Sequence, residues 1–373
     1  MFDIFKNRLE ITGRLTTVTA LRISKGRSTE PIGSDLPVIK DALGRPLIPG
    51  SSFKGALRSR LESFLRGILG SDRKLVANPA IENEWSLTAN ELKSIKECDL
   101  KQLLAVYLLM EEDEFNNLAV LNIVEEVKNN RFPFIQELDL EKIVTLHSVK
   151  KNDEFRNFSL RDLVQVVTNQ TLLSEDQLNS LKQKYTYDFA LTAVTLQQTD
   201  LVSHLFGSPW IASKFQVRDL TVQPDAWFGQ YQERDGVAID RDTETAADGK
   251  LYDYQVVPAA TPFDFKAVVE NARDWELGLL MIGLHQFETE QIPLGGGRSR
   301  GLGVVKLEID KMLWVDVEDH PEFLLEYLKK LVMGDETAYE DAADYKDEWV
   351  QKLIDKLLKN NTSQSSPTQI VQG

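Results

Sequence analysis

Residues 32–58 read IGSDLPVIKDALGRPLIPGSSFKGALR and combine three clusters of turn residues with the start of a helix. The turn clusters lie at 33–35, 44–46 and 49–52. Their Pro and Gly residues fix an unusual backbone path. Ser51 or Ser52 is predicted to cap the helix, because a hydroxyl oxygen can accept a hydrogen bond from a free N–H group of the first turn.

The helix after this loop is predicted to bury one face, because apolar residues recur at helical spacing. These residues are Phe53, Leu57, Leu61, Phe64, Leu65 and Ile68, and the other positions carry Lys54, Arg58, Arg60 and Arg66. A helix N-terminus beside hydroxyls and Lys54 is suited to binding an anion. With four cations nearby, the anion we expect is a phosphate chain. An ordinary capped amphipathic surface helix explains this stretch equally well.

Composition limits the class of protein. The chain has 373 residues, enough for two domains or for one domain with a large insertion. Its single cysteine, Cys98, excludes an internal disulfide framework and a Cys-rich zinc site. We find no signal peptide and no apolar run of membrane-spanning length, so we expect a cytoplasmic protein with no membrane partner.

The charge is unevenly distributed along the chain. The formal net charge is −15, yet residues 1–74 hold 14 Lys and Arg against 7 Asp and Glu. The basic excess therefore lies in the segment that carries the opening loop. Phosphate binding depends on the local potential, which salt screens over roughly 10 Å, so the acidic total does not exclude a nucleic-acid partner.

Patterning divides the chain into five parts. They are a first core part with a half-buried strand at 8–23 (1–74), a helical insertion (75–199), a second core part (200–310), acidic helices (311–360) and a disordered tail (361–373). The insertion has no glycine, and we expect a strand within it near 141–146. Cys98 and His147 are too isolated to form a metal site and are predicted to be structural.

The second core part is predicted to hold strands, a hairpin and helices. Residues 201–206 read as a helical turn, 215–222 and 263–269 as strands, 234–257 as a protruding hairpin, and 274–287 as a helix with Asp274 as its N-cap. Two further acidic helices are predicted at 321–333 and 338–359.

A glycine-rich turn precedes the last strand of this part. It holds Gly296, Gly297, Arg298, Ser299 and Arg300. Closely spaced glycines let backbone N–H groups approach a phosphate, and the arginines favour an anion role over a plain connector. The turn lacks the Gly-Lys-Ser/Thr ending of a P-loop, and it precedes a strand where a dinucleotide fingerprint would open a helix.

These stretches together resemble a known superfamily. Residues 33–41 and 48–58 resemble the N-terminal signature of CRISPR-associated RAMP proteins, and 295–303 resemble its glycine-rich loop. Residues 205–208, 217–219 and 236–241 further resemble the backbone subunits of type III effector complexes. The matches cover residues 1–74 and 200–310 in the right order. The insertion is longer than a minimal backbone subunit carries, which points to a type III variant, with the D subtype as the first candidate.

The resemblance implies a fold and partners. The fold is α+β, with a modified ferredoxin-like (RRM-like) palm, a β-hairpin thumb and a largely helical insertion. The palm would hold the guide crRNA, and the thumb, with Val237, Ile239 and Arg241, would wedge between base pairs of guide and target RNA. Other CRISPR effector subunits are implied as partners.

The resemblance also implies roles for individual residues. Asp35 stands where cleaving backbone subunits require an aspartate, so it is the candidate catalytic residue and the candidate ligand of a divalent metal, Mg²⁺ first. As residues alone, Gly-Ser-Asp reads as an Asx-turn. The candidate RNA-binding residues are Ser51, Ser52, Lys54, Arg58, Gly296, Gly297, Arg298, Ser299 and Arg300.

Three alternatives stay open beside a cleaving backbone subunit. The first is the same crRNA-binding scaffold without cleavage, with Asp35 as a turn residue. The second is a guide-processing endoribonuclease, which would usually need a catalytic histidine, and none of the four histidines is placed to suggest that role. The third is an unrelated phosphate-binding enzyme.

Overall fold

The computed structural model describes residues 4–24, 26, 36–112, 119–132, 135, 138–155, 157–169, 174–239, 246–317 and 320–364. The chain forms two compact units. The first comprises residues 1–70, 205–207 and 212–373, and the second comprises residues 71–204 and 208–211. Each unit is described here by itself.

The first unit is built on a five-stranded sheet in the order β3-β7-β1-β8-β9, in which all neighbours are antiparallel. The strands are β1 (Asn7–Thr17), β3 (Phe215–Val217), β7 (Pro262–Glu270), β8 (Val305–Asp316) and β9 (Glu340–Asp341). Strand β1 is central and pairs along its length with β7 and β8. The two segments that resemble the superfamily therefore contribute to one sheet.

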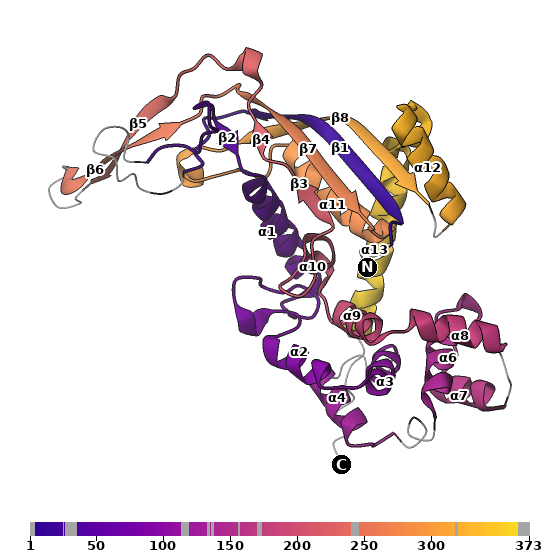
Figure 1. Ribbon diagram of the computed structural model, residues 1–373. Coiled ribbons are helices and arrows are strands. Elements are labelled where there is room, and N and C mark those ends of the chain that lie inside the picture. The colour runs from indigo at the N-terminus through magenta and orange to yellow at the C-terminus, as the bar shows by residue number, and fades with distance from the viewer. Residues whose placement is uncertain are drawn as a thin grey trace. The chain divides into compact units, whose positions relative to one another are not determined.

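Two helices complete a βαββαβ arrangement. Helix α1 (Gly50–Leu69) connects β1 to β3, and α11 (Asp274–Glu288) connects β7 to β8. Both helices lie on the same side of the sheet (Figure 1). The strand order places β7 between β1 and β3, which is the split βαβ connectivity of a ferredoxin-like fold. With the helices, this sheet gives the predicted α+β class.

Aromatic and aliphatic side chains form the core between the sheet and these helices. Leu9, Ile11 and Leu15 of β1 are fully buried, as expected for alternate residues facing one side of a strand. The Phe53 ring lies 5.0 Å from the ring of Phe265 on β7 and stacks 4.3 Å from that of Phe287 on α11. Phe53 therefore joins α1 to both the sheet and the second helix.

Two smaller sheets accompany the main one. Strands β5 (Gln232–Ile239) and β6 (Ala246–Val256) form the antiparallel hairpin predicted at 234–257. The hairpin extends beyond the end of the main sheet (Figure 1). Strand β2 (Leu47–Ile48) pairs with β4 (Leu220–Thr221). This pairing connects the loop before α1 to the segment that follows β3.

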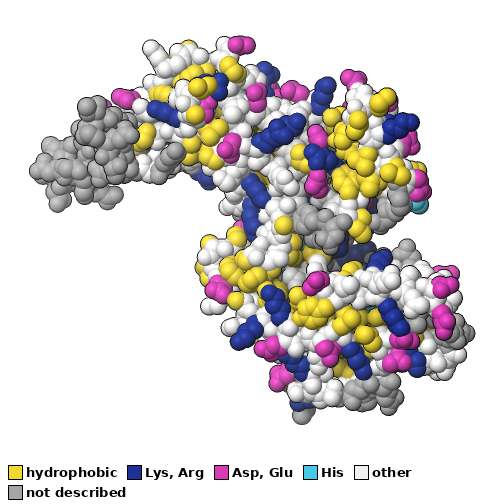
Figure 2. All heavy atoms as spheres, viewed as in Figure 1, with side chains coloured by type: hydrophobic (Ala, Val, Ile, Leu, Met, Phe, Trp, Pro, Cys, Tyr) yellow, Lys and Arg dark blue, Asp and Glu magenta, His cyan; other side chains and the backbone are white. Residues whose placement is uncertain are grey.

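The C-terminal elements are α12 (Pro321–Met333) and α13 (Lys346–Gln364). Gly278 lets α13 approach α11 closely, since a Cβ there would lie 2.1 Å from the carbonyl oxygen of Trp349. Most of α12 is exposed, and its position in Figure 1 corresponds to a hydrophobic area in Figure 2. That area includes Phe323, Leu325, Leu328, Leu331, Val332 and Met333.

The second unit is helical. Its helices are α2 (Ala89–Lys96), α3 (Leu100–Met110), α4 (Val120–Lys128), α6 (Leu140–Lys150), α7 (Leu160–Asn169), α8 (Glu175–Lys184), α9 (Tyr187–Gln197) and most of α10 (Leu201–Phe206). Buried aliphatic residues from these helices make a hydrophobic core of their own. Cys98 and His147 are both buried in it, as predicted for structural residues.

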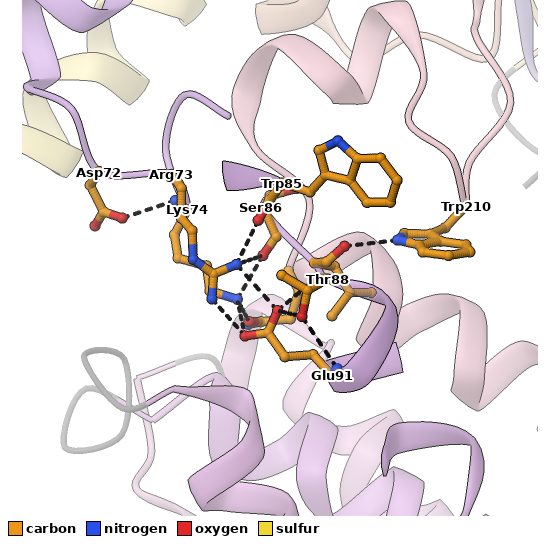
Figure 3. Close-up of polar contacts among 10 residues, drawn as sticks. Asp72, Arg73, Lys74, Trp85, Ser86, Thr88, Glu91 and Trp210 are labelled. Carbon is orange, nitrogen blue, oxygen red and sulfur yellow. Dashed lines mark hydrogen bonds and ion pairs between the residues drawn. The ribbon is translucent and has the colours of Figure 1, made fainter. Parts of the chain in front are cut away.

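A polar network joins the beginning and the end of the helical unit (Figure 3). Arg73 and Lys74 both contact the Glu91 carboxylate, and Lys74 Nζ also donates to Gln198 Oε1 at 2.8 Å. Burial acts to raise the pKa of Glu91, but hydrogen bonds from Arg73 and from the backbone of Thr88 hold it at about 2. Glu91 therefore stays ionised and fixes both cations.

A tryptophan pair continues this connection. Trp210 Nε1 donates to the Leu87 carbonyl oxygen at 2.8 Å, and the Trp210 ring lies edge-on to that of Trp85 with centroids 5.9 Å apart (Figure 3). The last residues of the helical unit are thus attached to its first residues.

The structure corrects several predicted elements. The strand expected at 141–146 lies within helix α6, which the Asp139 side chain caps by accepting a hydrogen bond from Lys142 N. The strand expected at 215–222 is interrupted between β3 and β4. Helix α11 begins at Asp274 with Arg273 as its N-cap, so Asp274 is not the cap.

Corrections also apply to the C-terminal part. Residues 311–316, assigned to the acidic helices, belong to strand β8. The helix expected from 338 begins at Lys346, after β9 and a 3₁₀ turn at Ala342–Tyr345. Residues 361–364, assigned to the tail, are the end of α13, and 365–373 lie outside the described residues. A membrane-crossing helix is absent from the described part of the chain.

Candidate nucleic-acid interface

Helix α1 does not begin as the sequence predicted. Its first residue is Gly50 and its N-cap is Pro49, so Ser51 and Ser52 lie inside the first turn and neither is the cap. The Gly50 N–H donates to Asp219 Oδ1 at 2.8 Å. A carboxylate from a distant segment therefore occupies the position that the sequence assigned to a serine or an anion. Pro49 supplies the extended backbone that precedes the helix.

Lys54 is part of an internal contact. Its Nζ donates to Ser213 Oγ at 2.5 Å and to the Phe215 carbonyl oxygen at 3.1 Å, which links α1 to the start of β3. Burial, together with the charge of Arg58, lowers the pKa of Lys54 to about 8. A contact between Lys54 and an RNA phosphate stays a prediction.

Arg58 is also held within the first unit. Its Nη1 donates to the Gly207 carbonyl oxygen at 2.9 Å and its Nε to Glu62 Oε1 at 2.8 Å. Only 17% of its side chain is exposed. Arg66 contacts the same Glu62 carboxylate at 3.4 Å. The basic face of α1 therefore includes cations that already have partners within the protein. These contacts are also consistent with the alternative of an ordinary amphipathic helix.

The glycine-rich loop is fastened to the segment after β1. Gly296 N donates to the Arg22 carbonyl oxygen, and Gly303 N donates to that of Ala20, both at 2.9 Å. Gly295 has a φ of +73°, and a Cβ there would lie 2.1 Å from the Arg22 carbonyl oxygen. Only glycine allows this approach, so the loop has a fixed structure. Its role in binding an anion stays a prediction.

The three residues after the glycines form a surface turn. Arg298, Ser299 and Arg300 make one turn of 3₁₀ helix, and all three are exposed. Arg298 Nε donates to the Gly295 carbonyl oxygen at 3.3 Å, which keeps that side chain near the loop. The structure thus brings these three candidate residues together with Gly296 and Gly297.

Arg300 connects this turn to the hairpin. Its Nη1 donates to the hydroxyl oxygen of Tyr252 on β6 at 2.8 Å. The hydrogen bond from Arg300 lowers the pKa of the Tyr252 hydroxyl. Gly236 lies opposite Tyr252 in the β5–β6 ladder, and a Cβ there would lie 2.4 Å from the tyrosine ring. Glycine at 236 lets the ring lie across β5.

Two similar pairs lie on neighbouring segments. The Arg22 guanidinium lies 4.7 Å from the centre of the Tyr254 ring, and Lys40 Nζ lies 4.3 Å from that of Tyr231. Tyr252 and Tyr254 are two residues apart on β6, so they share a face, with ring centres 6.1 Å apart. We call the pairs Arg300–Tyr252, Arg22–Tyr254 and Lys40–Tyr231 the cation–tyrosine strip.

Residues 36–40 run between the pairs of this strip. Gln255 N donates to the Leu36 carbonyl oxygen at 3.1 Å beside Tyr254, and Ile39 N donates to that of Ile23 at 2.8 Å beside Arg22. Lys40 stands at the other end of the segment. The second half of the opening loop therefore forms the backbone support of the strip.

The sequence did not identify most of the strip. Arg22, Lys40, Tyr231, Tyr252 and Tyr254 were not predicted as site residues. The alternation of Tyr252 and Tyr254 in β6 was the only visible signal, because their cation partners are far away in the chain. Interleaved cations and aromatic rings are typical of nucleic-acid binding. Arg300 is the exposed member of this strip, whereas the Tyr254 ring is buried and the other members are half-buried.

Other predicted residues have different outcomes. Asp35 and Arg241 lie outside the described residues. Val237 and Ile239 lie on β5, where their backbones pair with Leu251 and Ala246. Within the described residues, no group of three or more His, Cys, Asp or Glu side chains is arranged to hold a metal ion.

Comparisons with known proteins identify a family for this chain. The family model of the RAMP superfamily matches residues 14–306. Three curated relatives carry the name CRISPR system Cms endoribonuclease Csm3. The relative from Mycobacterium tuberculosis is 48% identical over 56 residues, that from Enterococcus italicus 41% over 66, and that from Methanocaldococcus jannaschii 45% over 58.

These relatives are matched over short segments. The matched segments cover 14%, 17% and 15% of this chain, in the same order. They span 24%, 31% and 23% of the relatives' own lengths, so the chain covers less than a third of each.

Proposed function

This chain belongs to the RAMP superfamily, and on that basis we propose that it is a backbone subunit of a type III CRISPR RNA-guided effector complex. In this role it binds the crRNA along its backbone and cleaves complementary target RNA. The relatives named as Csm3 endoribonucleases support the proposed activity through their short matched segments. Other effector subunits are proposed as partners.

The cation–tyrosine strip is the observation that carries this proposal. Arg298 and Arg300 are exposed on a rigid turn, with Arg22 and Lys40 on adjoining segments. Guanidinium groups bind phosphate oxygens in a fixed geometry, and such contacts position RNA without reading its sequence. In a guided complex, base pairing supplies the specificity, so the protein needs no base-edge code.

The fold divides into a palm and a thumb under this proposal. The five-stranded sheet with α1 and α11 is the palm, which holds the crRNA backbone. The β5–β6 hairpin is the thumb, and Val237, Ile239 and Arg241 are its proposed contacts with the paired RNA strands. The hydrogen bond from Arg300 to Tyr252 supports this division, because it fixes the base of the hairpin to the glycine-rich loop.

Asp35 is the proposed catalytic residue. It directly precedes Leu36, whose backbone is bonded to the residue after Tyr254. Cleavage by the RNA's own 2′-hydroxyl requires removal of its proton, in-line attack on phosphorus and stabilisation of charge on the phosphate. The Asp35 carboxylate can accept that proton under this proposal, while arginines on the strip can stabilise the phosphate charge.

A divalent metal ion is the proposed cofactor, with Mg²⁺ as the first candidate. Mg²⁺ commonly binds through one or two carboxylates together with phosphates of the substrate. Asp35 is the proposed protein ligand. When bound, the ion would supply additional charge stabilisation at the scissile phosphate.

The test compares effector complexes purified with their crRNA. Asp35→Asn removes the charge and the basic oxygen with little change in size, so complementary RNA should still bind. Its cleavage should slow by roughly 10²- to 10⁴-fold. Asp310→Asn, at an exposed position on β8, is the matched control and should cleave normally. Cleavage by Asp35→Asn at the normal rate would exclude Asp35 from the chemistry. Binding without cleavage by the unmodified complex would favour the non-cleaving scaffold.

A further inference from the structure

Three aromatic rings form a cluster just before the hairpin, in which Phe228 is exposed and Trp227 and Tyr231 are half-buried. The Trp227 ring centre lies 5.5 Å from that of Phe228 and 5.0 Å from that of Tyr231. The Phe228 side chain is 64% exposed. A large aromatic residue held beside other rings at the surface is a common feature of binding sites.

The cluster is fixed to the segments around it. The Tyr231 hydroxyl donates to the Gly44 carbonyl oxygen at 2.6 Å. Asp41 holds that turn in place, since its Oδ1 accepts hydrogen bonds from Leu43 N and Arg45 N, both at 2.9 Å. The rings are therefore prearranged, which reduces the conformational entropy lost when a ligand binds.

The cluster continues the cation–tyrosine strip. Tyr231 belongs to both, because Lys40 Nζ lies over its ring. Residues 36–40 pair with neighbouring segments at Leu36, Val38 and Lys40, so they are extended. Four residue steps of extended chain span roughly 13 Å. About four stacked nucleotides span the same distance. A strand of about four nucleotides therefore matches the length of this segment, from the Leu36–Tyr254 pairing to Lys40 over the Tyr231 ring.

We propose that Phe228 and Trp227 form a stacking platform for an unpaired base of the RNA strand that follows the cation–tyrosine strip. This inference rests on the proposed RNA binding. Aromatic rings next to cations match a nucleotide, which presents a flat base beside a negative phosphate. Every base has a flat face, so the platform positions the strand and does not select its sequence.

The test measures binding of a labelled oligoadenylate of about 12 nucleotides, within the range of known single-strand sites. Phe228→Leu keeps an apolar side chain but removes the ring, and it should weaken binding roughly 5- to 150-fold. Phe228→Tyr keeps the ring and should bind within about twofold of the unmodified protein. The salt dependence of Phe228→Leu should be unchanged, because no cation is lost.

The matched control is Phe323→Leu, which alters another exposed phenylalanine, on α12. It should leave RNA affinity unchanged. Equal affinity of Phe228→Leu and the unmodified protein would overturn the platform while leaving the proposed RNA binding intact. Absence of RNA binding by the unmodified protein would overturn both. Reduced self-association of Phe228→Leu with unchanged RNA affinity would identify the cluster as a protein interface instead.

Discussion

The Arg300 guanidinium donates a hydrogen bond of 2.8 Å to the Tyr252 hydroxyl oxygen, across a separation of 48 residues. This contact connects two features that the sequence presented separately, the arginine-bearing glycine loop and the hairpin. Arg300 is exposed and Tyr252 is half-buried, so an RNA strand can reach the arginine end of this pair. The pair can therefore be altered in two distinct ways. A substitution at Arg300 removes the charge, and a substitution at Tyr252 removes the hydrogen-bond partner.

Arg300→Ala should weaken RNA binding and reduce its salt dependence. Each phosphate contact contributes about 0.7 to the slope of log affinity against log salt for a single strand. Loss of Arg300 should therefore lower that slope by about 0.7. Tyr252→Phe keeps the arginine charge, so its slope should equal that of the unmodified protein. Fluorescence titrations at several salt concentrations measure both quantities.

Lys329→Ala provides the control for this prediction. Lys329 is an exposed cation on α12, outside the cation–tyrosine strip. Its removal should leave the slope unchanged. Equal slopes for Arg300→Ala and Lys329→Ala would contradict a phosphate contact at Arg300.

The sequence predicted elements whose signal is local. Alternation identified β1, although this strand ends at Thr17 and the prediction ran to residue 23. Helical spacing identified α1, and two apolar arms around a polar tip identified the hairpin. The start of α1 was less clear, because its first N–H group, that of Gly50, donates to Asp219, far along the chain. Periodicity also misplaced one position of the buried face of α1, since Leu69 is buried while Ile68 is 49% exposed.

The candidate site was harder to predict than the fold. The glycine loop was visible because closely spaced glycines and arginines are adjacent in sequence. The aromatic partners of the strip were missed, since Arg22 and Tyr254 meet only after the sheet forms. Lys54 and Arg58 were predicted to contact an anion because helical spacing shows on which face of the helix a residue lies. Spacing does not show which carbonyl oxygens lie opposite that face, here those of Phe215 and Gly207.

The glycines of α1 predict opposite effects of the same substitution. A Cβ on Gly50 would lie 2.4 Å from the Val217 carbonyl oxygen, whereas a Cβ on Gly55 would meet no atom within 4 Å. Gly50→Ala should therefore force α1 away from β3 and lower the free energy of unfolding by about 1–3 kcal/mol. Gly55→Ala should raise it by about 0.5–1 kcal/mol, because Ala favours a helix more than Gly does.

Urea denaturation of the two variants beside the unmodified protein measures this difference. The two substitutions are mutual controls, because both add one methyl group to the same helix. Similar stability changes in both variants would contradict the close approach at Gly50.

A buried ion pair predicts a large stability effect in the first unit. Lys214 Nζ lies 2.5 Å from Glu276 Oε2, and both side chains are at most 1% exposed. Burial lowers the pKa of Lys214, and the charge of Glu276 opposes this effect. Lys214→Met would leave a buried carboxylate without its cation and should cost about 3–5 kcal/mol of unfolding free energy.

The double variant Lys214→Met, Glu276→Leu separates the pair from its surroundings. With both charges removed, most of the lost stability should return, because no charge remains buried without a partner. Thermal denaturation can compare the three proteins. A double variant less stable than Lys214→Met alone would show that the two residues do not act as a pair.

His147 predicts how the helical unit responds to acid. Its ring is fully buried beside the rings of Tyr107, Tyr185 and Phe189, and neither ring nitrogen has a hydrogen-bond partner among the described residues. Burial, with a smaller effect of the Lys151 charge, lowers the pKa of His147 to about 3. The folded state therefore holds the neutral imidazole.

The direction of the pH effect follows from this lowered pKa. Below the usual histidine pKa of about 6.5, the unfolded chain binds a proton that the folded chain excludes. The contribution of His147 is fully present above pH 6.5 and is lost as the pH falls towards 3, at about 1.4 kcal/mol per pH unit.

His147→Phe should remove this part of the pH dependence. Between pH 7 and pH 5, the unfolding free energy of the unmodified protein should fall about 2 kcal/mol more than that of the variant. Urea denaturation at both pH values, followed by a signal from the helical unit, measures this difference, with the exposed His285→Phe as the control substitution. A pH dependence in His147→Phe equal to that of the unmodified protein would contradict a buried neutral imidazole at this position.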